Sequence, residues 1–520
     1  MNTKVIKEMA EQTAVMLVNG QRRHIKRTAG AIFIGGQIIT QAGDGVAAVR
    51  ETVRDHRQSM SQPPLVVSDF ENGCGGMVKG LTEFPLLMNL GAANMPQLAY
   101  DYGKATAIEA ASIGVNAAFA PVCDLNINKD NPIINTRAVS DDPKLCISIL
   151  TQIIKGMQQN GLAACAKHFP GDGVDCRDQH ITTTCNNLPM DRWLDSSGAI
   201  FDSVIKEGVS LIMPGHITLP CYQKKRINGL LPPATLSDEL LENLLRNEMG
   251  FRGVTVSDAT MMGGFKGFYK TKAQSEVECF KAGCDLILWP EEDYVDNIVS
   301  AVENGYIKEK RLYDAYERIQ ELKSKYIKSD DFTDLSLKQK QFLKQVQQTA
   351  AERSITLIKN SNDLLPFKND VRRILVVSLC NHPDNLDSAA LLTDELKARG
   401  YEAELHQQLP FDNFNALSDT VDIKSERADL CIYAMFTRAF RPAGPIDFWD
   451  EKCWYIAKSF GPALSKTIYV SFGNPYFANK YFEKASTYIN AYSTSKPVVK
   501  AFVKAACGEI PFCGTSPVEL

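Results

Sequence analysis

The sequence lacks the features that mark a membrane, exported or nucleic-acid-binding protein. No apolar run approaches the roughly 20 residues that span a bilayer. The N-terminal segment MNTKVIKEMAEQTAVMLVNGQRRHIKR is charged throughout, without the apolar core of a secretory signal. The net charge of -4 in 520 residues gives no excess of basic groups for a nucleic-acid surface. We therefore expect a cytoplasmic protein with neither membrane nor nucleic-acid partners.

The sequence also lacks the common metal-binding and nucleotide-binding motifs. The 14 cysteines include no C-x-x-C pair, the 7 histidines form no H-E-x-x-H, and no G-x-x-x-x-G-K-[ST] loop occurs. These absences argue against a zinc site and against a nucleotide-binding loop. Cysteines within apolar runs, such as Cys123, Cys165, Cys284 and Cys431, predict buried free thiols in a reducing compartment.

Short apolar runs, in contrast, recur along the first part of the chain. Runs such as GAIFIGG and PLVVSDFENG do not alternate with polar residues, and segments of helical spacing precede most of them. Such strands, covered on both faces and separated by helices, predict a parallel sheet. Seven of these units within about 300 residues predict a TIM-like (β/α)8 barrel over residues 1–328, with its eighth strand unassigned.

Composition changes after the barrel. The segment from Tyr306 to Gln348 is highly charged and helix-forming. We expect a linker and the first helix of a second domain over residues 329–348. Further strand and helix units follow, among them RRILVVSLC, ADLCIYAMF and KTIYVSFGNP. They predict an αβα sandwich over residues 349–520.

Polar residues with catalytic potential directly follow the apolar runs. In a barrel the carboxyl ends of the strands meet on one rim, where active sites are built. A single polar residue at a strand end is commonly structural, whereas several on one rim predict a shared cavity. The residues are Asp69, Asp124, Lys167, His168, His216 and Asp258. Because Lys167 and His168 are adjacent, both can enter the cavity only at a bulge or twist.

The segment AKHFPGDGVDCRDQH is the densest in titratable groups. Asp178 and His180 are two residues apart, so on extended backbone their side chains share a side. A carboxylate fixes the tautomer of an imidazole and raises its basicity, which suits general acid–base catalysis. An incidental surface ion pair is the alternative. Asp258, in GVTVSDATMM, suits a nucleophile, a base or a helix cap, and Arg137 adds a cation on the loop NPIINTRAVSDDP.

The chain resembles glycoside hydrolase family 3, and within it the β-N-acetylglucosaminidase branch. The similar segments stand in family order: SDFENG, FAPVCDLN, NPIINTRAVSDDP, AKHFPGDGVDCRDQH, LIMPGHI and GVTVSDATMM. The later VSFGNPY and GEIPFCGTSPVEL resemble the family's second domain. The resemblance implies a barrel followed by an αβα sandwich, and a retaining mechanism without a metal or an organic cofactor.

The resemblance also implies roles for individual residues. Asp258 would be the nucleophile, forming a covalent glycosyl-enzyme intermediate, and His180 the general acid/base supported by Asp178. Asp124 would lie in the wall of the site. Side chains expected to bind sugar hydroxyls are Asp69, Arg137, Lys167, His168 and His216. The implied partner is a glycan or muropeptide ending in β-linked N-acetylglucosamine, and the protein would be a monomer or a homodimer.

Two departures from the family pattern leave substrate detail open. Met77 stands where arginine is common, and Asp172 replaces the usual second histidine of K-H-F-P-G-H-G. Because a histidine acid/base does not repel phosphate as a carboxylate would, a phosphorylase using the same residues is an alternative. A β-glucosidase and a sugar-binding protein without activity are further alternatives.

Overall fold

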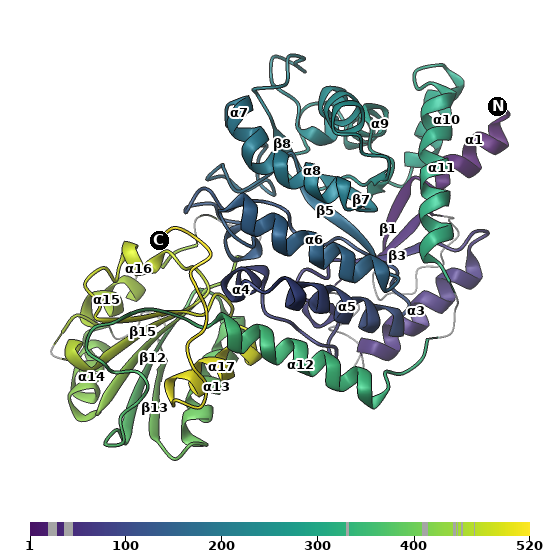
Figure 1. Cartoon of the computed structure of the whole chain (residues 1–520). Coiled ribbons are helices and arrows are strands. Elements are labelled where there is room, and N and C mark those ends of the chain that lie inside the picture. Colours follow the sequence, from purple (N-terminus) through teal and green to yellow (C-terminus); the bar gives the residue numbers. More distant parts are fainter. Residues whose placement is uncertain are drawn as a thin grey trace. The chain divides into compact units, whose positions relative to one another are not determined.

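The computed structural model of the chain (Figure 1) describes residues 1–18, 29–35, 45–328, 332–407, 414–439, 444, 446–448, 451–461 and 463–520. These residues form two compact units. The first unit comprises Met1–Glu83, Pro96–Ile134 and Asp142–Lys344, and the second comprises Phe84–Met95, Asn135–Asp141 and Gln345–Leu520. The expected domains were continuous in sequence, and nothing in the sequence indicated the two short segments of the second unit that lie before residue 142.

The first unit is a parallel barrel, as the sequence predicts. Its strands, in order around the sheet, are β10 (Ile287–Leu288), β1 (Ala14–Val18), β2 (Ala31–Ile34), β3 (Leu65–Ser68), β4 (Ala117–Ala118), β5 (Ala163–Phe169), β7 (Leu211–Pro214) and β9 (Val254–Thr255). A parallel bridge between Val256 and Leu286 joins the two end strands and closes the ring. The strand that the sequence left unassigned is β1, near the N-terminus.

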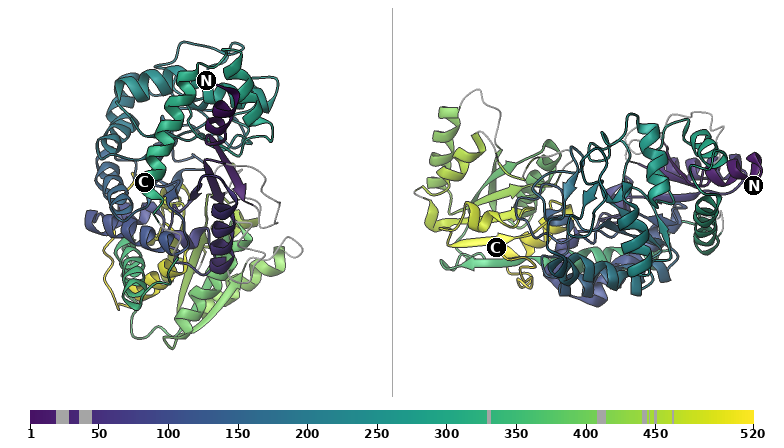
Figure 2. Two further views of the ribbon diagram at one scale, coloured as in Figure 1. Left: turned by 90° about the vertical axis from the view of Figure 1, so that its right-hand side faces the viewer. Right: turned by 90° about the horizontal axis from the view of Figure 1, so that it is seen from above.

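Helices cover the outside of this ring (Figures 1 and 2). They are α3 (Gly45–Ser59), α5 (Pro96–Ser112), α6 (Pro143–Gln159), α8 (Ala199–Lys206), η5 (Glu239–Glu248), α9 (Lys272–Ala282) and α10 (Tyr294–Glu303). Their start signals are local. For example, Asp142 caps α6 by accepting a hydrogen bond from Lys144 N, and Pro143 occupies the first helical position. The inward faces of these helices are apolar, which explains why the strands carry no alternation.

Helix α11 (Glu309–Tyr326) covers the amino ends of the strands. Ile319, Leu322 and Tyr326 belong to the same apolar cluster as the side chains that fill the barrel. The Tyr326 hydroxyl also lies 2.8 Å from Ser210 Oγ, directly before β7. The carboxyl ends of the strands form the opposite rim of the barrel.

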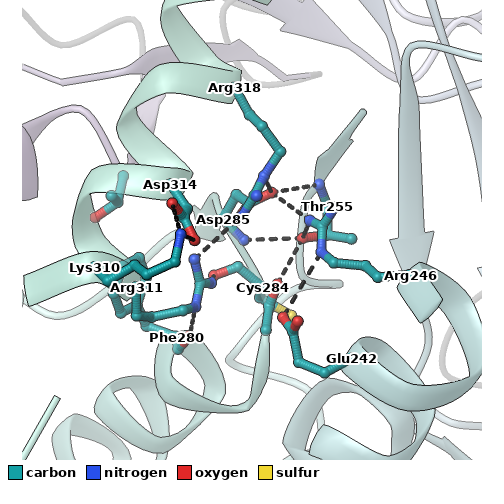
Figure 3. Close-up of polar contacts among 12 residues, drawn as sticks. Glu242, Arg246, Thr255, Phe280, Cys284, Asp285, Lys310, Arg311, Asp314 and Arg318 are labelled. Atoms are coloured by element: carbon teal, nitrogen blue, oxygen red, sulfur yellow. Dashed lines mark hydrogen bonds and ion pairs between the residues drawn. The ribbon is translucent and has the colours of Figure 1, made fainter. Parts of the chain in front are cut away.

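Asp285 anchors this base of the barrel (Figure 3). It directly precedes β10, is fully buried and binds three guanidinium groups, with N–O distances of 2.7 Å to Arg246, 3.0 Å to Arg311 and 2.7 Å to Arg318. Burial alone would raise the pKa of the Asp285 carboxyl, but the three neighbouring cations hold it well below its usual range. The arrangement ties η5 and α11 to the start of β10.

Replacing Asp285 by asparagine should lower the free energy of unfolding by about 3–5 kcal/mol, because the guanidinium groups would lose their buried counter-charge. The carboxylate stabilises the fold above its unfolded pKa of about 3.9, and this contribution disappears as pH falls through the depressed folded value. Urea denaturation at pH 7 and at pH 3 measures both effects. Asp314→Asn is the control, since Asp314 is partly exposed and pairs with the exposed Lys310. A loss for Asp285→Asn no larger than for this control would contradict the assignment.

The second unit is an αβα sandwich, also as predicted. Its sheet has the order β11 (Thr356–Asn360), β16 (Thr487–Asn490), β15 (Thr467–Phe472), β14 (Leu430–Phe436), β12 (Arg373–Cys380) and β13 (Glu402–Gln407). Only the pairing of β11 with β16 is antiparallel in the described sheet. One face packs against α12 (Leu337–Ser354), α13 (Leu386–Lys397) and α17 (Lys496–Ala506), and the other against α14 (Phe414–Arg427), α15 (Glu451–Lys458) and α16 (Phe477–Lys480).

The short helix α4 (Leu87–Ala93) packs within this second unit. Met88 and Ala92 share an apolar cluster with Tyr476, Tyr492 and Val518. Across both units, no helix of the described residues combines the length and apolar character needed to cross a bilayer.

Candidate active site

The structure places the predicted strand-end residues at the carboxyl end of the barrel strands. Asp69 follows β3, Asp124 follows β4, His216 follows β7 and Asp258 follows β9. Lys167 and His168 lie near the carboxyl end of β5. There the pairing of β5 with β7 shifts register between Lys167 and Phe169. This irregularity is the bulge that the sequence required for adjacent side chains to enter one cavity. The Lys167–His168 peptide bond is cis.

Lys167 lies between two carboxylates. Its Nζ is 2.9 Å from Asp69 Oδ1 and 2.7 Å from Glu71 Oε1. The lysine side chain is only 4% exposed, whereas the two carboxylates remain partly exposed. Glu71 was not among the predicted residues, because it lies in the turn after β3 rather than at the strand end. Its position in SDFENG, two residues after Asp69, was the available signal.

His168 connects a buried carboxylate to Asp258. Its Nδ1 is 2.7 Å from Asp124 Oδ2, so Nδ1–H donates to Asp124 and Nε2 lies 3.9 Å from Asp258 Oδ2. Asp124 is fully buried and also accepts hydrogen bonds from the backbone N–H groups of His168 and Asp172. This contact set gives Asp124 the supporting position in the wall that we expected, and it fixes the orientation of the His168 ring.

Asp258 is held as an anion. Its side chain is 13% exposed, and its Oδ1 accepts a hydrogen bond of 2.7 Å from Ala259 N. Burial alone would raise the pKa of Asp258, but the nearby His168, His216 and His180 imidazoles and the Ala259 N–H lower it below its ordinary value. At neutral pH the rim therefore presents an ionised, partly accessible carboxylate.

The pair His180 and Asp178 lies on the loop after β5. Asp178 is buried, and its Oδ1 accepts hydrogen bonds from His180 Nδ1 at 2.7 Å and from His180 N at 2.8 Å. The Asp178 carboxylate thus fixes the Nδ1–H tautomer and leaves Nε2 free of this contact. The His180 side chain is 20% exposed, so this imidazole can exchange a proton with a bound molecule.

The loop that carries His180 is bound to the loop that follows Asp258. Gly263 N donates to His180 O at 2.8 Å, and Gly264 N donates to Gln179 O at 3.1 Å. A Cβ atom on Gly263 would lie 2.0 Å from Ile181 O, so this close approach requires glycine. The backbone contacts place the imidazole and the Asp258 carboxylate on neighbouring loops of one rim.

His216 and Arg137 are the remaining two residues that the sequence predicts for the site. His216 is fully buried, and its ring nitrogens lie 3.0 Å from Thr235 Oγ1 and 3.0 Å from Ala259 O. These contacts support the backbone beside Asp258, and the expected contact of His216 with a sugar hydroxyl stays a prediction. Arg137 ends the turn η2 (Asn135–Arg137), which belongs to the second unit, and its sugar contact stays a prediction.

The two departures from the family pattern have different surroundings. Met77 is partly buried and packs against the apolar cluster that fills the barrel. Asp172 is buried, and its Oδ1 accepts hydrogen bonds from Gly173 N at 2.6 Å and Asn131 Nδ2 at 3.2 Å. Burial, reinforced by the negative charge of Asp124, raises the pKa of Asp172 to about 7. Asp172 can therefore remain protonated near neutral pH.

Asp172→Asn should stabilise the protein relative to wild type as pH rises. Between the unfolded pKa of about 3.9 and the folded value, the wild-type unfolded chain loses a proton that the native state keeps, so native stability falls with rising pH. Asparagine does not titrate, and the difference in Tm between variant and wild type should increase from pH 5 to pH 8. Thermal unfolding at both values measures it, with Asp191→Asn, at an exposed position of helix α7 (Met190–Trp193), as control. A difference independent of pH would show that Asp172 ionises normally.

No group of three or more histidine, cysteine, aspartate or glutamate side chains in the described part of the chain has the geometry to hold a metal ion. The carboxylates near the rim are instead engaged by Lys167, His168, His180 and backbone N–H groups. What the rim offers chemically is one accessible carboxylate, one tautomer-fixed imidazole, and polar groups suited to hydroxyls.

This combination defines a barrel enzyme with a carboxylate and a carboxylate-supported histidine at the carboxyl ends of its strands. The sequence profile of the glycosyl hydrolase family 3 N-terminal domain matches residues 6–322. A relative from Cellulomonas fimi, named beta-N-acetylglucosaminidase/beta-glucosidase, is 30% identical over 511 residues, which cover 94% of this chain and 89% of the relative. The chain belongs to glycoside hydrolase family 3.

Other relatives and structures agree with this assignment. Beta-hexosaminidase A of Pseudoalteromonas piscicida is 30% identical over 52% of this chain and 49% of its own length. A solved beta-glucoside phosphorylase, BglX, has a TM-score of 0.86 at 25% identity and covers 99% of this chain and 93% of its own. A family 3 beta-N-acetylglucosaminidase from Paenibacillus sp. str. FPU-7 has the same fold, with a TM-score of 0.83 at 24% identity and coverage of 99% and 98%.

Proposed function

We propose that the protein is a retaining β-N-acetylglucosaminidase that removes terminal β-linked N-acetylglucosamine. Asp258 is the nucleophile, and His180, oriented by Asp178, is the general acid/base. The observation that carries this proposal is the junction of two loops: hydrogen bonds from Gly263 and Gly264 hold the imidazole-bearing loop against the loop that follows an ionised Asp258.

In the first step an oxygen of Asp258 attacks the anomeric carbon. The bond from this carbon to the aglycone oxygen breaks and its electron pair stays on that oxygen. His180 enters this step as an imidazolium, supplies its Nε2 proton to the oxygen and is left as the neutral Nδ1–H tautomer. In the second step water attacks the anomeric carbon, His180 accepts a proton from it, and the bond to Asp258 breaks. Two inversions at one carbon give net retention.

The remaining rim residues provide hydrogen bonds for the sugar. Asp69 and Glu71 have accessible carboxylate oxygens and are held by Lys167, so they can accept from hydroxyls of the terminal sugar. Lys167 can act as a donor to the same ring. His168 can donate from Nε2 as an imidazolium, because its Nδ1–H is already donated to Asp124. Arg137 is proposed as a further donor on the basis of its motif alone. Because these contacts form with a charged transition state, their removal should reduce kcat more than it raises KM.

The names of the relatives support the N-acetyl sugar as substrate. The Cellulomonas fimi relative is named for both an N-acetylglucosaminide and a glucoside, and the Pseudoalteromonas piscicida relative for a hexosaminide. We infer that the terminal residue is N-acetylglucosamine, with glucose as a weaker alternative. Aryl N-acetylglucosaminide and aryl glucoside, compared by kcat/KM, distinguish them. A larger kcat/KM for the glucoside would overturn the choice.

Phosphorolysis is the second candidate, because the acid/base is an imidazole. Asp178 is buried beneath His180, so the group facing an incoming nucleophile is not a carboxylate that would repel a phosphate dianion. The solved structure of BglX, at 25% identity, is described as a beta-glucoside phosphorylase. An assay of the aryl glycosides with and without inorganic phosphate distinguishes hydrolysis from phosphorolysis. Free N-acetylglucosamine as sole product supports hydrolysis, and sugar 1-phosphate as main product would replace it by phosphorolysis.

A further inference from the structure

Two segments at the rim carry an excess of exposed positive charge. Lys224 and Arg226 lie in the segment 221–231, which follows β8 (Ile217–Thr218), and Lys266 and Lys270 lie in the loop after β9. All four are exposed, and within the part of the chain that the structure describes none has an ion-pair partner. We call these four side chains the cationic edge.

Nearby carboxylates do not neutralise the cationic edge. Asp238 pairs with Lys225 at 2.6 Å, so its charge is already matched. Glu239 is buried and accepts hydrogen bonds from the backbone N–H groups of Lys224 and Lys225. Glu248 accepts a hydrogen bond from the Tyr222 hydroxyl in the same segment. Against these two carboxylates, the four cations leave the cationic edge with a net positive charge toward an approaching molecule.

Hydrogen bonds join the cationic edge to the loop that carries the acid/base. Asn228 Nδ2 donates to Phe268 O at 2.9 Å and links the segment 221–231 to the loop after β9. On that same loop, Gly263 N donates to His180 O at 2.8 Å, and Lys266 N donates to Gly263 O at 3.2 Å in a turn. Lys266 is thus one turn away from the contact that holds His180.

Two large apolar side chains lie beside the catalytic groups on these loops. Ile181 directly follows His180 and is 59% exposed, and Met261 lies three residues after Asp258 and is 54% exposed. A residue that protonates a leaving oxygen must face the aglycone, so its neighbours line the aglycone side. Apolar contacts with positive charge around them suit a leaving group that has an apolar face and an anionic substituent.

We propose that the cationic edge binds an oxyanion on the aglycone side of the site, with Ile181 and Met261 contacting the apolar part of the leaving group. This inference rests on the proposed function. The oxyanion has two possible sources with the same chemistry: a carboxylate carried by the aglycone, or inorganic phosphate that replaces the departing aglycone. In both cases exposed lysine and arginine supply attraction that weakens as salt rises.

The test compares two aryl N-acetylglucosaminides that differ only in charge, one with a ring carboxylate and one with its methyl ester. For wild type, the ratio of kcat/KM for carboxylate to ester should fall by about tenfold between low and 1 M salt. In the variant Arg226→Gln/Lys266→Gln the ratio at low salt should fall by about tenfold. The ester alone should be turned over at an unchanged rate. The control Lys4→Gln/Lys310→Gln removes the same charge from exposed positions in α1 (Thr3–Glu11) and α11.

A second arm identifies the source of the oxyanion. Wild type and variant are assayed on the ester with inorganic phosphate or with chloride at equal ionic strength. Phosphate-dependent release of sugar 1-phosphate that is lost in the variant assigns the edge to phosphate. A changed carboxylate-to-ester ratio without phosphate dependence assigns it to the aglycone.

The outcomes against the proposal are distinct. An unchanged ratio and unchanged phosphate response in the variant, with normal ester turnover, would overturn the inference and leave the proposed function intact. If the wild-type protein turned over neither the carboxylate substrate nor its methyl ester, the proposed function would be overturned, and this inference with it.

Discussion

Asp258→Asn is expected to lower kcat on aryl N-acetylglucosaminides by roughly 10⁴-fold or more, as removal of a covalent nucleophile does in other enzymes. The amide keeps the shape of the carboxylate but can neither bond to the anomeric carbon nor balance the charge that develops there. Because the Ala259 N–H contact and the burial of the side chain remain, the fold should be retained. Steady-state kinetics and a thermal unfolding curve measure both consequences.

The role of Asp258 as nucleophile can be tested directly by locating the covalent intermediate. A fluorinated N-acetylglucosaminide that traps the intermediate should label the peptide containing Asp258, and the first-formed sugar should keep the β configuration. Asp191→Asn, which alters an exposed carboxylate outside the site, is the matched control and should retain full activity. Label on a different residue, or inversion at the anomeric carbon, would remove Asp258 from the nucleophile role.

His180→Ala is expected to slow substrates with poor leaving groups by about 10²–10⁴-fold, the usual contribution of general acid catalysis. Aryl substrates with acidic phenols should lose far less in the first step, because a phenolate of low basicity leaves without a proton. The plot of log kcat/KM against leaving-group pKa should therefore become steeper in the variant. A series of substituted aryl N-acetylglucosaminides measures this slope.

Two further variants define the role of the histidine. Asp178→Asn should reduce the same rates less, because the imidazole remains but loses the buried carboxylate that fixes its Nδ1–H tautomer. Cys176→Ala changes an exposed side chain on the same loop and should leave the slope as in wild type. Equal slowing of good and poor leaving groups by His180→Ala would show that the histidine is not the acid.

Much of the fold could be predicted because it depends on local patterns. Unalternating apolar runs between helices indicate a parallel sheet, and the charged segment after Tyr306 indicates a change of domain. The strand β1 was not assigned, because its run AVMLV is short and lies among charged residues. The segments 84–95 and 135–141 join the second unit through contacts with residues distant in the chain. Met88 and Ala92 pack in an apolar cluster with Val518, and Ser140 Oγ donates to Pro517 O. Neither segment has a local pattern that indicates these contacts.

Some residues of the candidate site could likewise be predicted from local patterns, and others could not. Asp69, Lys167, His168 and Asp258 could be placed on one rim because they follow apolar runs, and strands of a barrel end together. Glu71 was missed because it enters the site from a turn. His216 had the same sequence signal as its neighbours, yet its ring nitrogens are occupied by Thr235 and by a backbone carbonyl. A strand-end position predicts the rim, but the contacts of a side chain decide whether it is free to bind.

The sequence by itself determined the two folds, the order of the strand-end residues and the pairing of Asp178 with His180, because each depends on spacing within a few residues. Only the tertiary structure decided that Lys167 lies between Asp69 and Glu71, that Asp258 stays ionised, and that the loop carrying His180 is bound to the loop after β9. These properties arise from groups far apart in the chain. Charge and desolvation act through space, and the fold alone sets those distances.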